Sequence, residues 1–140
     1  MSLQDDNKAL IRRWFAEVWN KGRAEAMQEM LASDGIVHGL GAAPLRGPGG
    51  FLPFFRKFRQ AFPDLQIAVE ETIAEGDLVT ARCVVRGRHT GDALGLAPTH
   101  RDTQFTGMTI VRIKDGKVVE AWNDFDFLAL YQQLGAFPPA

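Results

Sequence analysis

The stretch TQFTGMTIVRIKDGKVVEAWN, residues 103–123, decides the fold, because apolar and polar residues alternate on both sides of an Asp115-Gly116 turn. This pattern predicts a β-hairpin. Side chains alternate faces along a strand, so each strand has one apolar face. On the first strand that face holds Phe105, Gly107, Thr109, Val111 and Ile113. On the second strand it holds Val119, Ala121 and Asn123.

Two polar side chains, Thr109 and Asn123, stand on these apolar faces. A buried amide costs roughly 1–3 kcal/mol unless it is hydrogen-bonded. Asn123 is therefore predicted either to make a structural hydrogen bond, such as a local one before the last helix, or to face a cavity. Thr109 also fits the ordinary use of a β-branched residue in a strand.

The rest of the chain divides into helical and alternating segments. Helical spacing of apolar residues predicts helices over 5–19, 24–31 and 51–62, with a short strand over 35–38. The period changes to two at Leu65, and a long strand is predicted over 78–90. Asp126 is suited to cap a short final helix. Helices followed by sequential strands favour an α+β fold with helices on one face of a mainly antiparallel sheet.

Composition limits the classes of function. The 140 residues are 46% hydrophobic, which predicts one domain over 1–140 with a real core. A formal net charge of −1 gives no field favouring nucleic acid or an anionic membrane. Cys83 is the single cysteine, so a disulfide framework and multi-cysteine metal sites are not expected. The N-terminus has no signal-peptide pattern, and a cytoplasmic location is expected by default.

Known catalytic and cofactor motifs are not found. The chain has no GxSxG, Walker A, HExxH or glycine-rich dinucleotide turn, and its three histidines lack metal-ligand spacing. No metal and no cofactor is expected. On the long strand, Val79, Ala81, Cys83 and His89 share the apolar side, opposite Arg82, Arg86 and Arg88. His38 shares a side with Ile36, and each histidine is equally compatible with a structural hydrogen bond.

Several pieces of the sequence together resemble the SnoaL-like polyketide cyclases of the nuclear-transport-factor-2-like superfamily. The pieces are NKALIRRWFAEVWNKG, GPGGFLPFFRKFRQAFPDLQIAVEETIAEGDLV, GRHTGDALGLAPTHRDTQFTG, IVRIKDGKVVEAWNDFD and LYQQLG. The resemblance implies a curved antiparallel sheet wrapped by three N-terminal helices into a cone with an internal apolar pocket. It also implies a homodimer.

Characterised members of this family close a polyketide ring by intramolecular aldol condensation without metal or cofactor. The resemblance places their acid/base carboxylate at Asn123 and a pocket histidine at Thr109, and both are departures from the family pattern. An amide does not exchange a proton near neutral pH. General acid–base help worth roughly 100- to 10,000-fold in rate is therefore not supplied at that position.

The leading hypothesis is a small-molecule pocket protein that acts on an apolar carbonyl compound by proton transfer. Its proposed catalytic residues are Asn123, His89 and His38. The predicted ligand-binding residues are Trp14, Phe15, Phe55, Val79, Ala81, Cys83, Phe105, Thr109, Val119 and Ala121. The small residues Ala81, Gly107 and Ala121 are expected to leave the pocket its volume.

Other hypotheses remain open. One is a non-catalytic ligand-binding or dimerisation protein, and another is a different reaction on the same fold, such as ketosteroid-type isomerisation or epoxide hydrolysis. Those reactions rely on pocket carboxylates, and among the candidates only Glu71 has the inward parity. The Glu70-Glu71 pair is equally compatible with a bulge or with a solvent-exposed edge.

Overall fold

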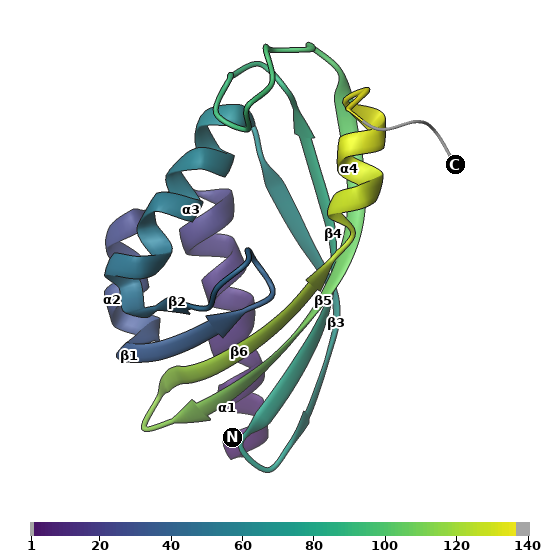
Figure 1. Ribbon diagram of the computed structural model, residues 1–140. Helices are drawn as coiled ribbons and strands as arrows, with labels where there is room; N and C mark the ends of the chain where they lie inside the picture. Colours follow the sequence, from purple (N-terminus) through teal and green to yellow (C-terminus); the bar gives the residue numbers. More distant parts are fainter. Residues whose placement is uncertain (1, 137–140) are drawn as a thin grey trace.

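One curved six-stranded sheet forms the body of the protein in the computed structural model, which describes residues 2–136 (Figure 1). The spatial order is β2-β1-β6-β5-β4-β3, and every neighbouring pair is antiparallel except β1 with β6. The strands are β1 (Leu31–His38), β2 (Leu45–Arg46), β3 (Gln66–Glu75), β4 (Leu78–Arg88), β5 (Asp102–Lys114) and β6 (Lys117–Phe125). The prediction of a mainly antiparallel α+β fold is confirmed.

The helices cover one face of this sheet, and the last one follows β6 (Figure 1). They are α1 (Leu3–Arg13), its π-helical continuation η1 (Trp14–Asn20), the 3₁₀ turn η2 (Ala24–Ala26), α2 (Met27–Met30), α3 (Gly47–Ala61) and α4 (Phe127–Gln133). Ser2 caps α1 and Asp126 caps α4, the latter as predicted. Helix α3 begins four residues before the predicted start at Phe51, because Pro48 is accepted in its first turn.

The β5–β6 hairpin turns at Asp115 and Gly116, both with positive φ, as a tight two-residue connection requires. A bulge interrupts the pairing: Arg112 lies opposite Glu120, whereas Ile113 lies opposite Val118. Val119 is the extra residue, so the inward face continues with Val118, which is buried. The prediction that Val119 shares the inward face with Ala121 and Asn123 is therefore wrong, because a bulge shifts alternation by one residue.

Between the helices and the concave face of the sheet lies one hydrophobic core cluster. Trp19 belongs to this cluster, with its ring 5.1 Å from that of Phe55 and 5.9 Å from that of Phe51. Edge-on and tilted aromatic contacts of this kind add stability beyond burial of area. Within residues 2–136, no helix is both long and apolar enough to cross a bilayer.

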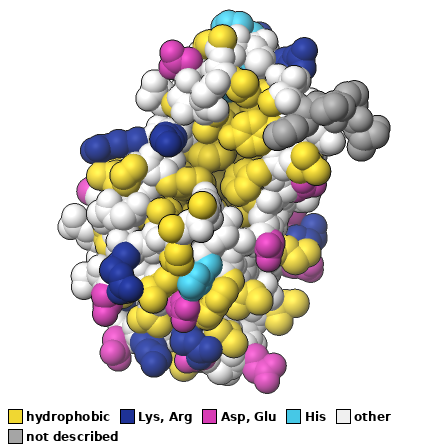
Figure 2. Space-filling model, in the orientation of Figure 1, with side chains coloured by type: hydrophobic (Ala, Val, Ile, Leu, Met, Phe, Trp, Pro, Cys, Tyr) yellow, Lys and Arg dark blue, Asp and Glu magenta, His cyan; other side chains and the backbone are white. Residues whose placement is uncertain are grey.

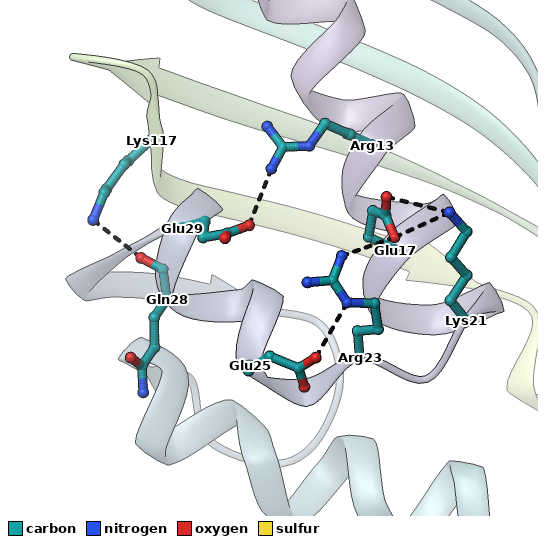
Figure 3. Close-up of polar contacts among 8 residues, drawn as sticks. All are labelled: Arg13, Glu17, Lys21, Arg23, Glu25, Gln28, Glu29 and Lys117. Carbon is teal, nitrogen blue, oxygen red and sulfur yellow. Dashed lines mark hydrogen bonds and ion pairs between the residues drawn. The ribbon is translucent and has the colours of Figure 1, made fainter.

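Exposed ion pairs tie the first helices together on the outside of the molecule (Figure 3). Arg23 bridges Glu17 and Glu25 at 3.2 and 3.1 Å, and Arg13 pairs with Glu29 at 3.0 Å. Exposed pairs contribute little, with a median of about 0–1 kcal/mol. The packing of these helices is therefore stabilised mainly by the hydrophobic core and only weakly by these surface ion pairs.

A partly buried pair of hydrogen bonds fixes the end of η1 to the sheet. The Asn20 side chain donates from Nδ2 to the Ile67 carbonyl oxygen at 2.9 Å and accepts from the Ile67 N–H at 2.6 Å. This pairing replaces a missing strand at the edge of β3. Because Asn20 follows Trp19 directly, it also helps to hold the tryptophan in the core.

We predict that Asn20→Ala lowers the free energy of unfolding by about 1–3 kcal/mol, because it leaves both main-chain groups of Ile67 without their partner. Urea denaturation measures the change. The control is Gln66→Ala, which removes an exposed 3.3 Å bond to the Asn20 carbonyl and should cost under about 0.5 kcal/mol. Equal effects of the two substitutions would contradict the role assigned to Asn20.

Candidate ligand cavity

An apolar cavity lies between the helices and the concave face of the sheet. Its volume is about 80 Å³, which is more than a single water needs. Figure 2 shows hydrophobic side chains gathered in a hollow between α3 and α4. The lining side chains are Ile11, Trp14, Phe15, Trp19, Leu31, Val37, Leu40, Phe51, Phe54, Phe58, Leu65, Ile67, Val85, Phe105, Thr109, Val111, Val118, Ala121, Asn123, Phe125 and Phe127. All are apolar except Thr109 and Asn123.

The helical wall of the cavity is aromatic, and the π-helical segment explains why. A π-helix bonds residue i to i+5, so Trp14 and Trp19 lie one turn apart and both reach the cavity. Phe51 of α3 packs edge-on against both, with ring centroids 5.3 and 5.9 Å away. The sequence predicted an ordinary α-helix here, in which residues five apart would face different directions.

Thr109 and Asn123 form the polar part of the sheet wall. They are directly opposite each other on β5 and β6, and cross-strand partners have Cβ atoms about 4.5–5.5 Å apart. Thr109 is only 2% exposed. Asn123 donates from Nδ2 to the His38 carbonyl oxygen at 2.9 Å and also lines the cavity. The amide thus has both of the roles that the sequence left open.

His89 does not line the cavity. It is fully buried at the end of β4, and its ring packs 5.4 Å from the ring of Phe62. Its Nδ1 accepts from the Thr99 N–H at 3.1 Å, so Nε2 carries the proton of the neutral ring. Burial lowers the pKa of His89, and the nearby charge of His100 lowers it further. These contacts give His89 a structural role in holding the loop between β4 and β5.

His38 is the last residue of β1. Its Nε2 is 2.8 Å from Oε2 of Glu120, and its ring stacks on Trp122 with centroids 5.8 Å apart. The ring is therefore directed away from the cavity, which it does not line. The main-chain oxygen of His38, in contrast, holds Asn123 in place.

The cavity includes half of the predicted ligand-binding residues. Those that line it are Trp14, Phe15, Phe105, Thr109 and Ala121. Those that do not are Phe55, Val79, Ala81, Cys83 and Val119. Val79, Ala81 and Cys83 are buried in the part of β4 that does not reach the cavity, whereas Val85 of the same strand lines it. Burial likewise raises the pKa of the Cys83 thiol to about 11.

Phe125 and Phe127 line the cavity but were not predicted to do so. Phe125 has the same parity as Ala121 and Asn123, so continuing the alternation by two residues would have found it. A Cβ at Gly107 would overlap the Phe125 ring. The small residue at 107 therefore makes room for that ring, and the prediction that it leaves free volume is wrong.

Glu71 is not an inward carboxylate. A register shift between Val69 and Glu71 moves its side chain to the exposed face, where Oε1 pairs with Nε of Arg82 at 2.9 Å. The inward parity of Glu71 is therefore wrong, and the alternative of a bulge at Glu70-Glu71 is the one that the pairing of β3 with β4 has.

The fold agrees with the comparisons with known proteins. The family model of the SnoaL-like polyketide cyclases matches residues 9–134. The chain is 32% identical over 139 residues to the aklanonic acid methyl ester cyclase DnrD of Streptomyces peucetius, covering 96% of this chain and 92% of the relative. The chain belongs to the SnoaL-like polyketide cyclase family.

Solved structures show the same fold. IdmH of Streptomyces antibioticus, a candidate polyketide cyclase, superposes with a TM-score of 0.80 at 31% identity, over 92% of this chain and 98% of that chain. AclR of Streptomyces galilaeus, a candidate hydroxylase, gives a TM-score of 0.87 at 27% identity, over 98% and 85%.

We predict that the free energy of unfolding falls as the pH falls below about 6.5, the ordinary pKa of histidine, in part because of His89. Its folded pKa is lowered, so the unfolded chain takes up the proton first and is favoured by acid. Replacement His89→Gln keeps an acceptor for the Thr99 N–H but does not titrate, so the dependence should be weaker.

Urea denaturation at several pH values between about 5 and 7.5 measures this dependence. The control is His100→Gln, which removes an exposed histidine and should leave most of the slope unchanged. An unchanged slope in the His89→Gln protein would contradict the assignment.

Proposed function

We propose that this protein binds an apolar polyketide-like carbonyl compound in its cavity and promotes closure of a ring within that compound. The observation that carries the proposal is the cavity itself, where aromatic and aliphatic side chains surround a single cross-strand pair of polar groups, Thr109 and Asn123. Ligand sites are commonly apolar with few, well-placed polar groups. Membership of the cyclase family supports the same reaction class.

In an intramolecular aldol closure, a carbon beside one carbonyl loses a proton and attacks a second carbonyl of the same molecule. The new carbon–carbon bond leaves a negative oxygen, which then takes up a proton. The cavity would fold the chain of the substrate so that the two carbons meet, which replaces a large entropy cost with binding. Thr109 and Asn123 would hold the oxygens through hydrogen bonds.

Proton transfer is the step for which the cavity has no titratable side chain. None of the lining residues ionises near neutral pH, and neither His38 nor His89 lines the cavity. We therefore assign proton transfer to water entering through the opening between α3 and α4. This arrangement predicts a slow cyclase, because a positioned acid/base usually contributes about 100- to 10,000-fold.

The same observation favours a second candidate function, a non-catalytic carrier of such compounds. A carrier needs the apolar cavity and its two hydrogen-bonding groups but no acid/base. In contrast, no observation favours an isomerase or an epoxide hydrolase, because Glu71 pairs with Arg82 on the exposed face. Turnover therefore distinguishes the two candidates that remain.

We predict that Asn123→Asp raises the rate of ring closure by about 100-fold, because it supplies a titratable group at the cavity wall. The new carboxyl faces the His38 carbonyl oxygen in place of Nδ2, and this contact favours its protonated form, so its pKa should be raised. Aklanonic acid methyl ester, which appears in the name of the relative DnrD, is the first substrate to test. Ring closure leaves the mass unchanged and is followed by chromatography.

The control is Asp124→Asn, which changes an exposed carboxylate next in sequence and should leave the rate unaltered. Ligand binding without turnover, both in the natural protein and with Asn123→Asp, would contradict the cyclase proposal and support the carrier. Failure to bind any apolar carbonyl compound would contradict both.

We also propose that two copies associate through the outer face of the sheet. This face exposes large apolar side chains of three strands, namely Ile73, Met108, Ile110 and Trp122. Burying such side chains contributes about 1.5–3 kcal/mol each.

The cytoplasmic location stays a prediction.

The expected mass in solution is twice that of the 15.5 kDa chain. Light scattering should show this mass at micromolar concentration and a shift to the single-chain mass with Ile110→Arg. A protein that is already monomeric without the substitution would contradict the dimer.

A further inference from the structure

The carboxamide of Asn123 is held in one of its two possible orientations. Its nitrogen lies 2.9 Å from the carbonyl oxygen of His38. A carbonyl oxygen only accepts hydrogen bonds, so the amide nitrogen and not the amide oxygen must face it. This contact assigns Nδ2 and Oδ1 without ambiguity.

The main chain after His38 packs against the main chain of Asn123, which keeps the His38 carbonyl oxygen in place beside the amide. Gly39 has a φ of +89°, and a Cβ at this position would overlap the main-chain oxygen of Asn123. The turn after His38 therefore lies directly against Asn123. Rotation of the carboxamide by half a turn would lose the bond and place two acceptor oxygens face to face.

The amide oxygen consequently remains available to a ligand. Among residues 2–136, Oδ1 of Asn123 accepts no hydrogen bond. It is also not one of the buried side-chain atoms that lack a hydrogen-bond partner. Asn123 lines the cavity beside Thr109, the other polar group of the wall. A buried hydroxyl such as that of Thr109 can either donate or accept.

We propose that Oδ1 of Asn123 accepts a hydrogen bond from a hydroxyl of the ligand, so that the cavity selects apolar compounds bearing a phenol, enol or alcohol O–H. This inference rests on the proposed function and narrows its substrate class. The hydroxyl of Thr109 donates to a neighbouring carbonyl oxygen of the same ligand. Asn123 stands at the position to which the family resemblance assigns an acid/base carboxylate. Here it acts instead as a hydrogen-bond acceptor that determines which ligands bind.

The physical reason is the cost of burying unpaired polar groups. A ligand hydroxyl that enters an apolar cavity without an acceptor loses its hydrogen bond to water and binds more weakly than its methyl ether. With an acceptor in place the order reverses, and sites built around such a bond reject analogues that lack the donor. The order of affinity of a hydroxyl compound and its methyl ether thus reports the acceptor directly.

The test uses β-naphthol and its methyl ether, which share one planar ring system and differ in the donor. Calorimetric titration of the full chain should show β-naphthol binding about 10-fold more tightly than the ether. Asn123→Leu keeps the size of the side chain and removes both amide atoms, so the ether should become the tighter ligand. The ratio of the two affinities does not depend on the folded fraction of a destabilised variant.

The matched control is Thr109→Val, which removes the other polar group of the wall and keeps its shape. It should leave the preference for β-naphthol in place. Tighter or equal binding of the ether to the natural protein would overturn the inference and favour the second Nδ2 hydrogen as the group facing the ligand. A preference for β-naphthol that survives Asn123→Leu would overturn it too. Binding of neither compound would overturn the proposed function together with this inference.

Discussion

The register of β5 against β6 is the constraint on which the rest of the site depends. A slip of one residue would move every side chain of a strand to the opposite face of the sheet. The Asp115-Gly116 turn sets this register, and the bulge at Val119 resets it before Ala121. Only with this pairing do Thr109 and Asn123 stand opposite each other on the concave face.

The helices determine what faces that pair. Because η1 is π-helical, Trp14 and Trp19 both reach the cavity, and the Asn20–Ile67 hydrogen bonds hold this segment against the edge of the sheet. Aromatic rings of α3 pack around the indoles edge-on. The cavity therefore keeps an aromatic wall on one side and a polar pair on the other.

Alternation along the strands predicted the fold, the hairpin, and the inward position of Phe105, Thr109, Ala121 and Asn123. It gave no sign of the bulge at Val119, because an extra residue leaves no signature in a pattern of period two, and it left a bulge at Glu70-Glu71 as one of several alternatives. Val119 was misplaced for this reason, and the bulge is the alternative that holds at Glu70-Glu71. Nor could a strand pattern show which helix covers which part of a face.

The histidines illustrate a different limit. Their chemistry made them candidates, but their role depends on partners distant in sequence, such as Glu120 for His38 and the loop residue Thr99 for His89. The orientation of the Asn123 amide likewise depends on the main chain of β1, which is parallel to β6. Such long-range contacts follow only from the assembled sheet.

A crystal structure of the protein with β-naphthol bound tests the central claim most directly. The ring system should lie between the aromatic wall of η1 and α3 and the concave face of the sheet. Its hydroxyl oxygen should lie within roughly 3.0 Å of Oδ1 of Asn123, the usual limit for an O–H···O hydrogen bond. A ligand bound on the outer face of the sheet, with the cavity left unoccupied, would contradict the claim that this cavity is the functional site.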